Sequence, residues 1–197
     1  KAASAIMRDL QAAGHDCKAL KVEVERVRLK SGRKALIGYR LTGIDAADRA
    51  FDQRVMMTLW PEGQPSRLPV MSGTDLTVPD FGPPAMQMQR LQASSWFFPN
   101  DRKIGHIAQL IEQGKEHGPV EIVHYVPEQG CTICVGQGLY GKVRADERGA
   151  VAASIGAATS GALRLAPIIS YDPEHRVLWQ QAVAGNSVPV AALTAHA

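Results

Sequence analysis

The stretch that decides the fold runs from Val120 to Arg144 and reads VEIVHYVPEQGCTICVGQGLYGKVR. It contains three short apolar runs, and each run is separated from the next by a turn-forming segment. The runs are 120–126, 131–135 and 139–144, and the turns are Pro127-Glu128-Gln129-Gly130 and Gly136-Gln137-Gly138. Apolar runs of this length, bounded by Gly and Pro, are typical of β-strands joined by tight turns. We therefore predict three consecutive antiparallel strands here.

The residues that follow extend this unit by a helix and two more strands. An Ala-rich segment predicts a helix over about 147–163, although its internal glycines weaken helix formation. Two further apolar runs, 165–171 and 176–183, flank Asp172-Pro173-Glu174-His175, which has the composition of a hairpin turn. The predicted order is strand, strand, strand, helix, strand, strand.

The N-terminal part of the chain predicts a second set of strands. A helix is expected over 2–13, closed by Gly14, and strands are expected over 22–29, 35–41 and 54–60. The segment 61–84 contains six prolines and predicts a long irregular connection.

A second helix is expected just ahead of the decisive stretch. Asn100 or Asp101 can cap it and Gly114 ends it, and the aromatic segment 96–98 is expected to pack the entry of this helix onto a core.

The predicted fold class is α+β, with two mainly antiparallel sheet modules and flanking helices. Gly118-Pro119 marks a composition shift, so we expect an N-terminal α+β module over 1–118 and a second module over 119–197. The two modules resemble a weak internal repeat, because the third strand of each carries a cation, Arg54 in the first and Lys142 in the second. Chance similarity between two hairpins is the alternative.

Composition argues against several classes of protein. The 197 residues are 45% hydrophobic and 21% charged, which is ordinary for a globular protein. The net charge of +3 is spread along the chain, so we expect no nucleic-acid partner. No apolar stretch reaches the ~20 residues of a membrane span, so no membrane partner is expected.

Cysteine usage and the two ends of the chain give further expectations. Three cysteines cannot all pair, which favours a reduced, cytoplasmic protein. The chain begins at Lys1 without a Met, and both ends look like those of a fragment.

Three short motifs are interpreted as structural or coincidental. Cys131 and Cys134 have a C-x-x-C spacing but lie in a predicted strand, where residues three apart point to opposite faces, so we expect core cysteines. Asp80-Phe81-Gly82 spells a kinase metal motif but lies among prolines, with no catalytic loop before it. The segment 136–142 fits most of a P-loop, yet Val143 replaces the Ser or Thr that binds magnesium. No metal ligands and no hydrolase motif are identified.

A fourth reading accounts for more residues. The motifs are Val123-His124-Tyr125-Val126-Pro127-Glu128-Gln129-Gly130-Cys131-Thr132-Ile133, then Leu139-Tyr140-Gly141-Lys142-Val143, then Val177-Leu178-Trp179-Gln180-Gln181-Ala182-Val183-Ala184-Gly185. With the predicted element order, they resemble the small lobe of the aminoglycoside phosphotransferase group of kinase-like enzymes.

The resemblance implies a nucleotide site. Lys142 would bind the α- and β-phosphates of ATP, and Gly130 would allow close approach of the first turn to the phosphates. Gln181 and Val183 would flank the adenine. Phosphoryl transfer needs such positioning and charge neutralisation.

The sequence departs from the family in three places, one of which is that the turn Pro127 to Gly130 has a single glycine. A glutamate partway along the predicted helix should pair with the lysine, but the only acid there is Glu147 at its start. The large lobe, which carries the base and the metal-binding aspartates, has no counterpart, so no catalytic residue and no metal ligand is assigned to this chain.

The resemblance predicts the N-terminal portion of an ATP-dependent phosphotransferase acting on a small hydroxylated compound. ATP and Mg²⁺ are the expected cofactors of the full-length protein, and the chain alone is expected to be inactive. The small-molecule substrate would be bound by the missing C-terminal lobe. The alternative is a non-catalytic interaction or regulatory module on the same hairpin fold.

Overall fold

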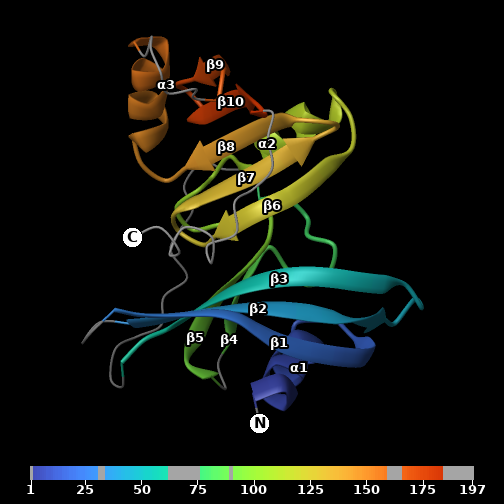
Figure 1. Ribbon diagram of the computed structural model, residues 1–197. Helices are drawn as coiled ribbons and strands as arrows, with labels where there is room; N and C mark the ends of the chain where they lie inside the picture. Colours follow the sequence, from blue (N-terminus) through green and yellow to red (C-terminus); the bar gives the residue numbers. More distant parts are fainter. Residues whose placement is uncertain (1, 31–33, 62–75, 89–90, 159–165, 184–197) are drawn as a thin grey trace, which may run out of the picture.

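A computed structural model describes residues 2–30, 34–61, 76–88, 91–158 and 166–183. These residues form two antiparallel five-stranded sheets with three flanking helices, so the predicted α+β class is confirmed. The two sheets form two units that are stacked on each other, with the second above the first in Figure 1.

The N-terminal unit consists of one helix and the first five strands. Its elements are α1 (Ala2–Ala12), β1 (Cys17–Lys30), β2 (Lys34–Asp45), β3 (Ala50–Leu59), β4 (Ala85–Met88) and β5 (Ala93–Phe97). The strand order in the sheet is β1-β2-β3-β5-β4. Ile6 and Leu10 of α1 pack on one face of this sheet against Leu41, Met57 and Phe97, all of which are fully buried.

The C-terminal unit repeats this plan with one more helix. Its elements are α2 (Ile107–Lys115), β6 (Val120–Val126), β7 (Gly130–Val135), β8 (Leu139–Arg144), α3 (Arg148–Ala158), β9 (Ile168–Asp172) and β10 (Val177–Gln181). The strand order is β6-β7-β8-β10-β9. Ile107 and Leu110 of α2 pack against Ile133, Val143 and Val177 on one face of this sheet.

The two sheets therefore share one strand order, and each has the helix that precedes it packed on one face. In the C-terminal unit, α3 lies between β8 and β9 in the chain. At the corresponding place in the N-terminal unit, the chain runs from β3 to β4. The described residues of that segment, 60–61 and 76–84, form no helix or strand. The structure also places α2, which precedes residue 119, against the second sheet.

The register compares one position of the two sheets. Lys142 of β8 lies opposite Leu178 of β10, which is the fourth pair of the β8–β10 ladder counted from Gln181. In the β3–β5 ladder, counted in the same way from Phe97, the fourth pair joins Thr58 to Ser94. Thr58 therefore has the same ladder position as Lys142, and Arg54 lies four residues before it in β3.

Several local predictions need correction. The strands β4 and β5 were not predicted, and the aromatic segment 96–98, expected to pack the entry of a helix, includes the end of a central strand in which every residue is buried. The helix expected from residue 101 begins only at Ile107, because the Asp101 carboxylate accepts the N–H groups of Lys103 and Ile104 in a preceding turn. Most of segment 61–84 and the end of the helix predicted over 147–163 lie outside the described residues.

Candidate functional site

Lys142 lies on the face of the second sheet that α2 does not cover. It is directly opposite Thr132 of β7 and Leu178 of β10, and residues opposite each other on neighbouring strands share a face. Val143 and Gly141, the neighbours of Lys142, point to the α2 side and are buried. The strand alternation thus separates the lysine from the hydrophobic core.

The ammonium group of Lys142 is half-buried and has no acidic partner among the described residues. Its Nζ donates a hydrogen bond of 2.7 Å to Oε1 of Gln180. Desolvation by burial, with the charge of Arg144 added, lowers the pKa of Lys142. Glu147, the one acid of the predicted helix, forms an ion pair of 3.1 Å with Arg176 instead. The site holds a cation whose charge is only partly compensated.

A shallow depression of about 160 Å³ lies beside Lys142. Its lining residues come from the ends of β6, β7 and β8 nearest the first turn: His124, Val126, Gln129, Gly130, Cys131, Thr132, Lys142, Val143 and Arg144. Lys142 and Arg144 make it basic. Because pockets for drug-sized ligands measure about 300–1,000 Å³, this depression suits a group of the size of a phosphate rather than a whole nucleotide.

Gly130, which shares this depression, has a structural reason to be glycine. A Cβ atom at this position would lie 2.9 Å from the carbonyl oxygen of Val143 in the adjacent strand. The close approach of β7 and β8 therefore requires glycine here whether or not a ligand is bound.

The first turn of the unit is held firmly by its neighbours. The backbone N–H of Glu128 donates to the Asp101 carboxylate at 2.9 Å, and the hydroxyl of Tyr125 donates to the same oxygen at 2.7 Å. The buried carboxylate of Glu128 forms ion pairs with Lys34 at 3.1 Å and with Arg102 at 2.7 Å. Since Lys34 belongs to β2, this buried cluster joins the two units.

Gln181 and Val183 line a second and larger depression at the opposite ends of the same strands. Its volume is about 570 Å³, and its lining residues are His117, Val135, Gly136, Gln137, Gly138, Leu139, Ile169, Gln181, Ala182 and Val183. The backbone N–H groups of Gln181 and Ala182 are already used, since they donate to Pro167 at 2.9 Å and to Gly138 at 2.7 Å. The side chain of Val183 is 50% exposed.

The structure therefore brings the four predicted residues together in pairs. Gly130 and Lys142 share one depression, and Gln181 and Val183 share another. Leu139 in the second depression and Lys142 in the first are three residues apart in β8, which is about 10 Å along a strand.

Tyr140 lies between the two depressions and was missed by the sequence reasoning. It is opposite Cys134 and Gln180, on the same face as Lys142, and it is half-buried. A hydrogen bond with Cys134 raises the pKa of its phenol. The signal was present in the sequence, because an aromatic residue two positions before a lysine in a strand shares its face. A ring at this place offers a flat surface for stacking.

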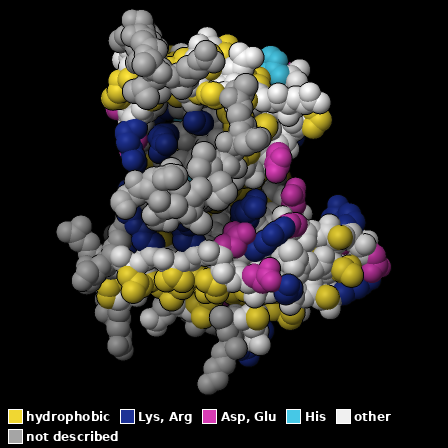
Figure 2. Space-filling model, viewed as in Figure 1, with side chains coloured by type: hydrophobic (Ala, Val, Ile, Leu, Met, Phe, Trp, Pro, Cys, Tyr) yellow, Lys and Arg dark blue, Asp and Glu magenta, His cyan; other side chains and the backbone are white. Residues whose placement is uncertain are grey.

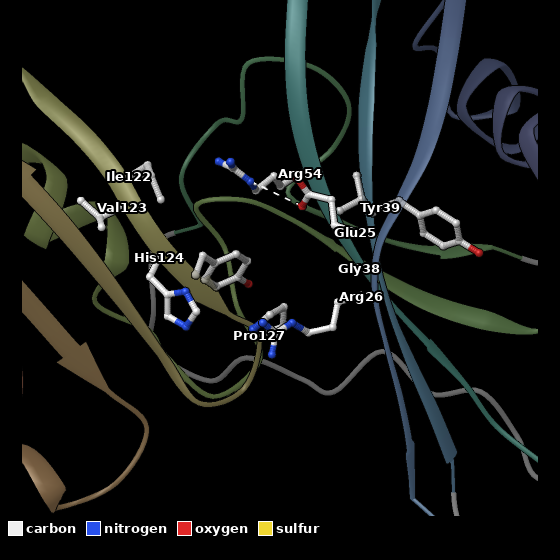
Figure 3. A pocket seen from close by; sticks show the side chains of 11 residues that line it. Glu25, Arg26, Gly38, Tyr39, Arg54, Ile122, Val123, His124 and Pro127 are labelled. Atoms are coloured by element: carbon white, nitrogen blue, oxygen red, sulfur yellow. Dashed lines mark ion pairs between the residues drawn. The ribbon is translucent and has the colours of Figure 1, made fainter. Parts of the chain in front are cut away.

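A further cavity of about 200 Å³ lies between the two units (Figure 3). Ile122, Val123 and His124 of β6 line one side of it, and Glu25 and Arg54 on the other side form an ion pair of 3.5 Å. Figure 2 shows Lys and Arg side chains, with Asp and Glu side chains among them, at the junction between the units. Arg26 and Arg54 line the cavity on the side of the N-terminal unit, and the lining residues of the other side include no Lys or Arg.

The remaining motifs have structural explanations. Cys131 is buried, and burial raises the pKa of its thiol to about 12, while Cys134 points to the opposite face beside Tyr140. Phe81 of the Asp80-Phe81-Gly82 segment stacks on Phe51 with ring centroids 3.9 Å apart. The lysine of the P-loop-like segment lies in a strand, where a P-loop would begin a helix.

Two negative findings apply to the residues that the structure describes. They contain no group of three or more His, Cys, Asp or Glu side chains that could hold a metal ion. None of their helices is long and apolar enough to cross a membrane.

Comparisons with known proteins add no relative. No family model, no curated protein and no solved structure matches this chain.

Proposed function

We propose that the C-terminal unit is the nucleotide-binding part of an ATP-dependent phosphotransferase that acts on a small hydroxylated compound. The observation that carries the proposal is the half-buried Lys142, which lies on the face of the sheet opposite α2 without an acidic partner among the described residues. The element order of three strands, a helix and two strands around it is the order that the resemblance requires.

The chemistry of this face supports the proposal. Phosphoryl transfer depends on fixed cations that hold the nucleotide phosphates while the γ-phosphoryl group passes to the acceptor hydroxyl. Lys142 and Arg144 supply two cations beside a depression of phosphate size. The burial that lowers the pKa of Lys142 also strengthens its attraction for an anion, because the surrounding dielectric constant is lower than that of water.

The rest of a nucleotide fits the same face in one direction. With its phosphates beside Lys142, the base would extend over Tyr140 toward Gln181 and Val183, about 10 Å along β8. The N–H groups of Gln181 and Ala182 are bonded within the sheet, so recognition of the adenine edge would fall to Val183.

The proposal assigns no catalytic base and no magnesium ligand to the described residues. In the proposed reaction, Mg²⁺ and the base would be held by the catalytic lobe that the resemblance implies. The three cysteines are free thiols, which supports a reducing compartment such as the cytoplasm.

The test measures binding of a non-hydrolysable ATP analogue to the chain by calorimetry, with and without Mg²⁺. We expect weak binding that Lys142→Ala reduces at least tenfold, which corresponds to about 1.4 kcal/mol. The matched control is Lys115→Ala, because Lys115 is exposed on α2 at the other face and pairs with Glu112. This control should bind like the unaltered chain.

Adenosine separates the two ends of the proposed site. It has no phosphates, so its binding should be the same in the unaltered chain and in Lys142→Ala. Equal binding of the ATP analogue by both proteins would reject the assignment of Lys142. Absence of analogue binding at millimolar concentration would reject the nucleotide function and favour a non-catalytic interaction module.

A further inference from the structure

The outer edge of β1 is an unpaired strand edge with exposed apolar side chains. In the first sheet β1 pairs with β2 alone among the described strands, and at 14 residues it is the longest strand of the molecule as described. Val24, Val27 and Leu29 are 59%, 57% and 76% exposed. Figure 2 shows a band of hydrophobic side chains over this strand. An edge of this kind is a template for pairing with another strand.

A β-bulge puts all the apolar residues of this edge on one face. The pairing with β2 shifts between Val24 and Arg26, which leaves Glu25 as the extra residue. Val24 is opposite Tyr39 and Val27 is opposite Ile37, and both of these partners belong to the α1 side of the sheet. Without the bulge, residues three apart would point to opposite faces.

The sequence of this edge is complementary to itself in the antiparallel direction. When two copies of 22–29 are aligned head to tail, Val24 of one copy faces Val27 of the other, and Val22 faces Leu29. On the opposite face of the sheet, Glu23 faces Arg28. Glu25 and Arg26 of both copies meet at the centre, with no net charge. Apolar and opposite-charge pairs across strands stabilise a sheet.

We propose that β1 pairs with β1 of a second copy of this chain, so that two N-terminal units form one continuous ten-stranded sheet about a two-fold axis. A two-fold interface requires one surface that complements itself, and the alignment of 22–29 satisfies this requirement in both its apolar and its charged pairs. The occupant is a second copy, because a partner of other sequence would have to supply the same order of charges by coincidence.

The interface is small, so the dimer is expected to be reversible. Each strand contributes eight residues, which extend over about 27 Å. A single pair of strands of this length is a small interface, since most stable complexes bury about 1,200–2,000 Å² in total. Sedimentation equilibrium over a range from micromolar to several hundred micromolar should show a monomer–dimer equilibrium. A chain that is monomeric at every concentration would overturn the proposal and leave the edge to a different protein.

Charge exchange gives the sharper test. Glu23→Arg places two arginines opposite each other in the dimer, and Arg28→Glu places two glutamates opposite each other. Each variant alone should dimerise at least tenfold more weakly. The double variant Glu23→Arg/Arg28→Glu should recover the affinity of the unaltered chain, and an equimolar mixture of the two single variants should form a mixed dimer.

The matched control is Glu121→Arg on β6, the edge strand of the other sheet, where the side chain is also exposed. It should leave the equilibrium unchanged. Val27→Lys is a second way to break the interface that does not depend on the charge pairs, and circular dichroism verifies that each variant is folded. Dimers that persist in both single variants and in Val27→Lys would contradict the pairing through β1.

Discussion

The two units have the same strand order but use the corresponding face of the sheet in different ways. In the N-terminal unit the face opposite α1 carries Leu36, Met56 and Trp96, which are buried and pack together. In the C-terminal unit the corresponding face carries the half-buried Tyr140 and Lys142, together with the buried Leu178 directly opposite Lys142. The face of the N-terminal unit is therefore closed by apolar side chains, whereas that of the C-terminal unit includes a half-buried cation.

The register makes the comparison specific. Thr58 has the position in β3 that Lys142 has in β8, and it is 1% exposed. A lysine there would have to leave its ammonium group in a dry environment, which is unfavourable without a partner. The two sheets thus share one strand order but differ in the character of this position, which is buried in one sheet and carries a half-buried cation in the other.

The largest expected effect concerns the cluster that joins the two units. Glu128→Ala removes the buried carboxylate and leaves Lys34 and Arg102 without it, so we expect a loss of about 3–5 kcal/mol in the free energy of unfolding. Chemical denaturation should also change from one transition to two, as the units lose their connection. The exposed pair of Glu112 with Lys115 provides the control, and Glu112→Ala should change the stability by less than about 1 kcal/mol.

The same cluster should make the stability depend on acid. Burial by itself raises the pKa of Glu128, but hydrogen bonds and charges from Arg102 and Lys34 outweigh it, so the pKa lies below its ordinary value of 4.5. The stabilisation is therefore present above about pH 4.5 and is lost as the pH falls through the lowered pKa. Denaturation curves between pH 3 and 7 should show a larger loss in the unaltered chain than in Glu128→Ala, in which other carboxylates of lowered pKa, such as Asp52 and Asp172, still titrate. Identical acid sensitivity of the two proteins would contradict the assignment.

A second prediction compares the buried sides of the two sheets. Met57 is fully buried in β3, while its counterpart in β8 is Gly141, whose place is filled by Leu110 and Trp179. Met57→Ala leaves a cavity and should destabilise the chain by about 2–4 kcal/mol. Gly141→Ala puts a Cβ 2.7 Å from Leu110 and 2.8 Å from Trp179 and should destabilise it by about 1–3 kcal/mol. A stabilising effect of Gly141→Ala, measured by urea denaturation, would show that the space beside α2 is not tightly packed.

A third prediction separates binding from stability at Lys142. Lys142→Met keeps an unbranched side chain, one atom shorter, and removes a charge that burial disfavours, so we expect a stability change within about 0.5 kcal/mol, toward greater stability. Because the pKa of Lys142 is lowered in the folded chain, its destabilising effect disappears as the pH rises through that lowered value. A clear loss of stability in Lys142→Met at neutral pH would mean that the lysine supports the sheet and is not reserved for a ligand.

A small effect is also expected as a pH response in the C-terminal unit alone. His175, in the turn between β9 and β10, forms an ion pair of 2.6 Å with Asp172, and this hydrogen bond raises the pKa of the imidazole. The ring of His106 faces it at 5.0 Å, and burial lowers the pKa of His106. The pair with Asp172 is fully stabilising below about pH 6.5, the unfolded value, and its contribution is lost as the pH rises through the raised pKa.

His175→Asn should therefore reduce the stability by less than about 1 kcal/mol at pH 6 and by nothing at pH 9. Thermal denaturation at both pH values measures this difference. A reduction of equal size at the two pH values would indicate a contribution from packing instead of charge.

The alternation of the sequence was sufficient to predict β6, β7 and β8 and to place Lys142 within a strand. It also predicted that Cys131 and Cys134 point to opposite faces, which the structure confirms. It was not sufficient for β5, where Ser94 and Ser95 are fully buried in a central strand. Because serine is polar, these two residues do not form an apolar run that would predict a strand. Their burial is imposed by neighbouring strands that lie far away in the chain.

Asp101 shows a similar limit of sequence-based prediction within the candidate site. The sequence predicted a helix cap at this position, and the carboxylate does accept two N–H groups of the following turn. Its second oxygen accepts bonds from Tyr125 and from the backbone of Glu128, which fix the first turn of the C-terminal unit. No spacing rule connects residue 101 to residues 24 and 27 positions later, so this function depends on the packing of the two units.

The sequence by itself determined the local properties of this protein: which runs are strands, where the turns lie and which residue types are available to meet a phosphate. These properties depend on side-chain alternation and on the backbone preferences of Gly and Pro, which act over a few residues. Tertiary structure alone decided that the two sheets share one strand order, that Thr58 and Lys142 have equivalent positions, and that Lys34 reaches Glu128. Such contacts form only when distant segments are packed together, because the free energy that selects them comes from burial shared between elements.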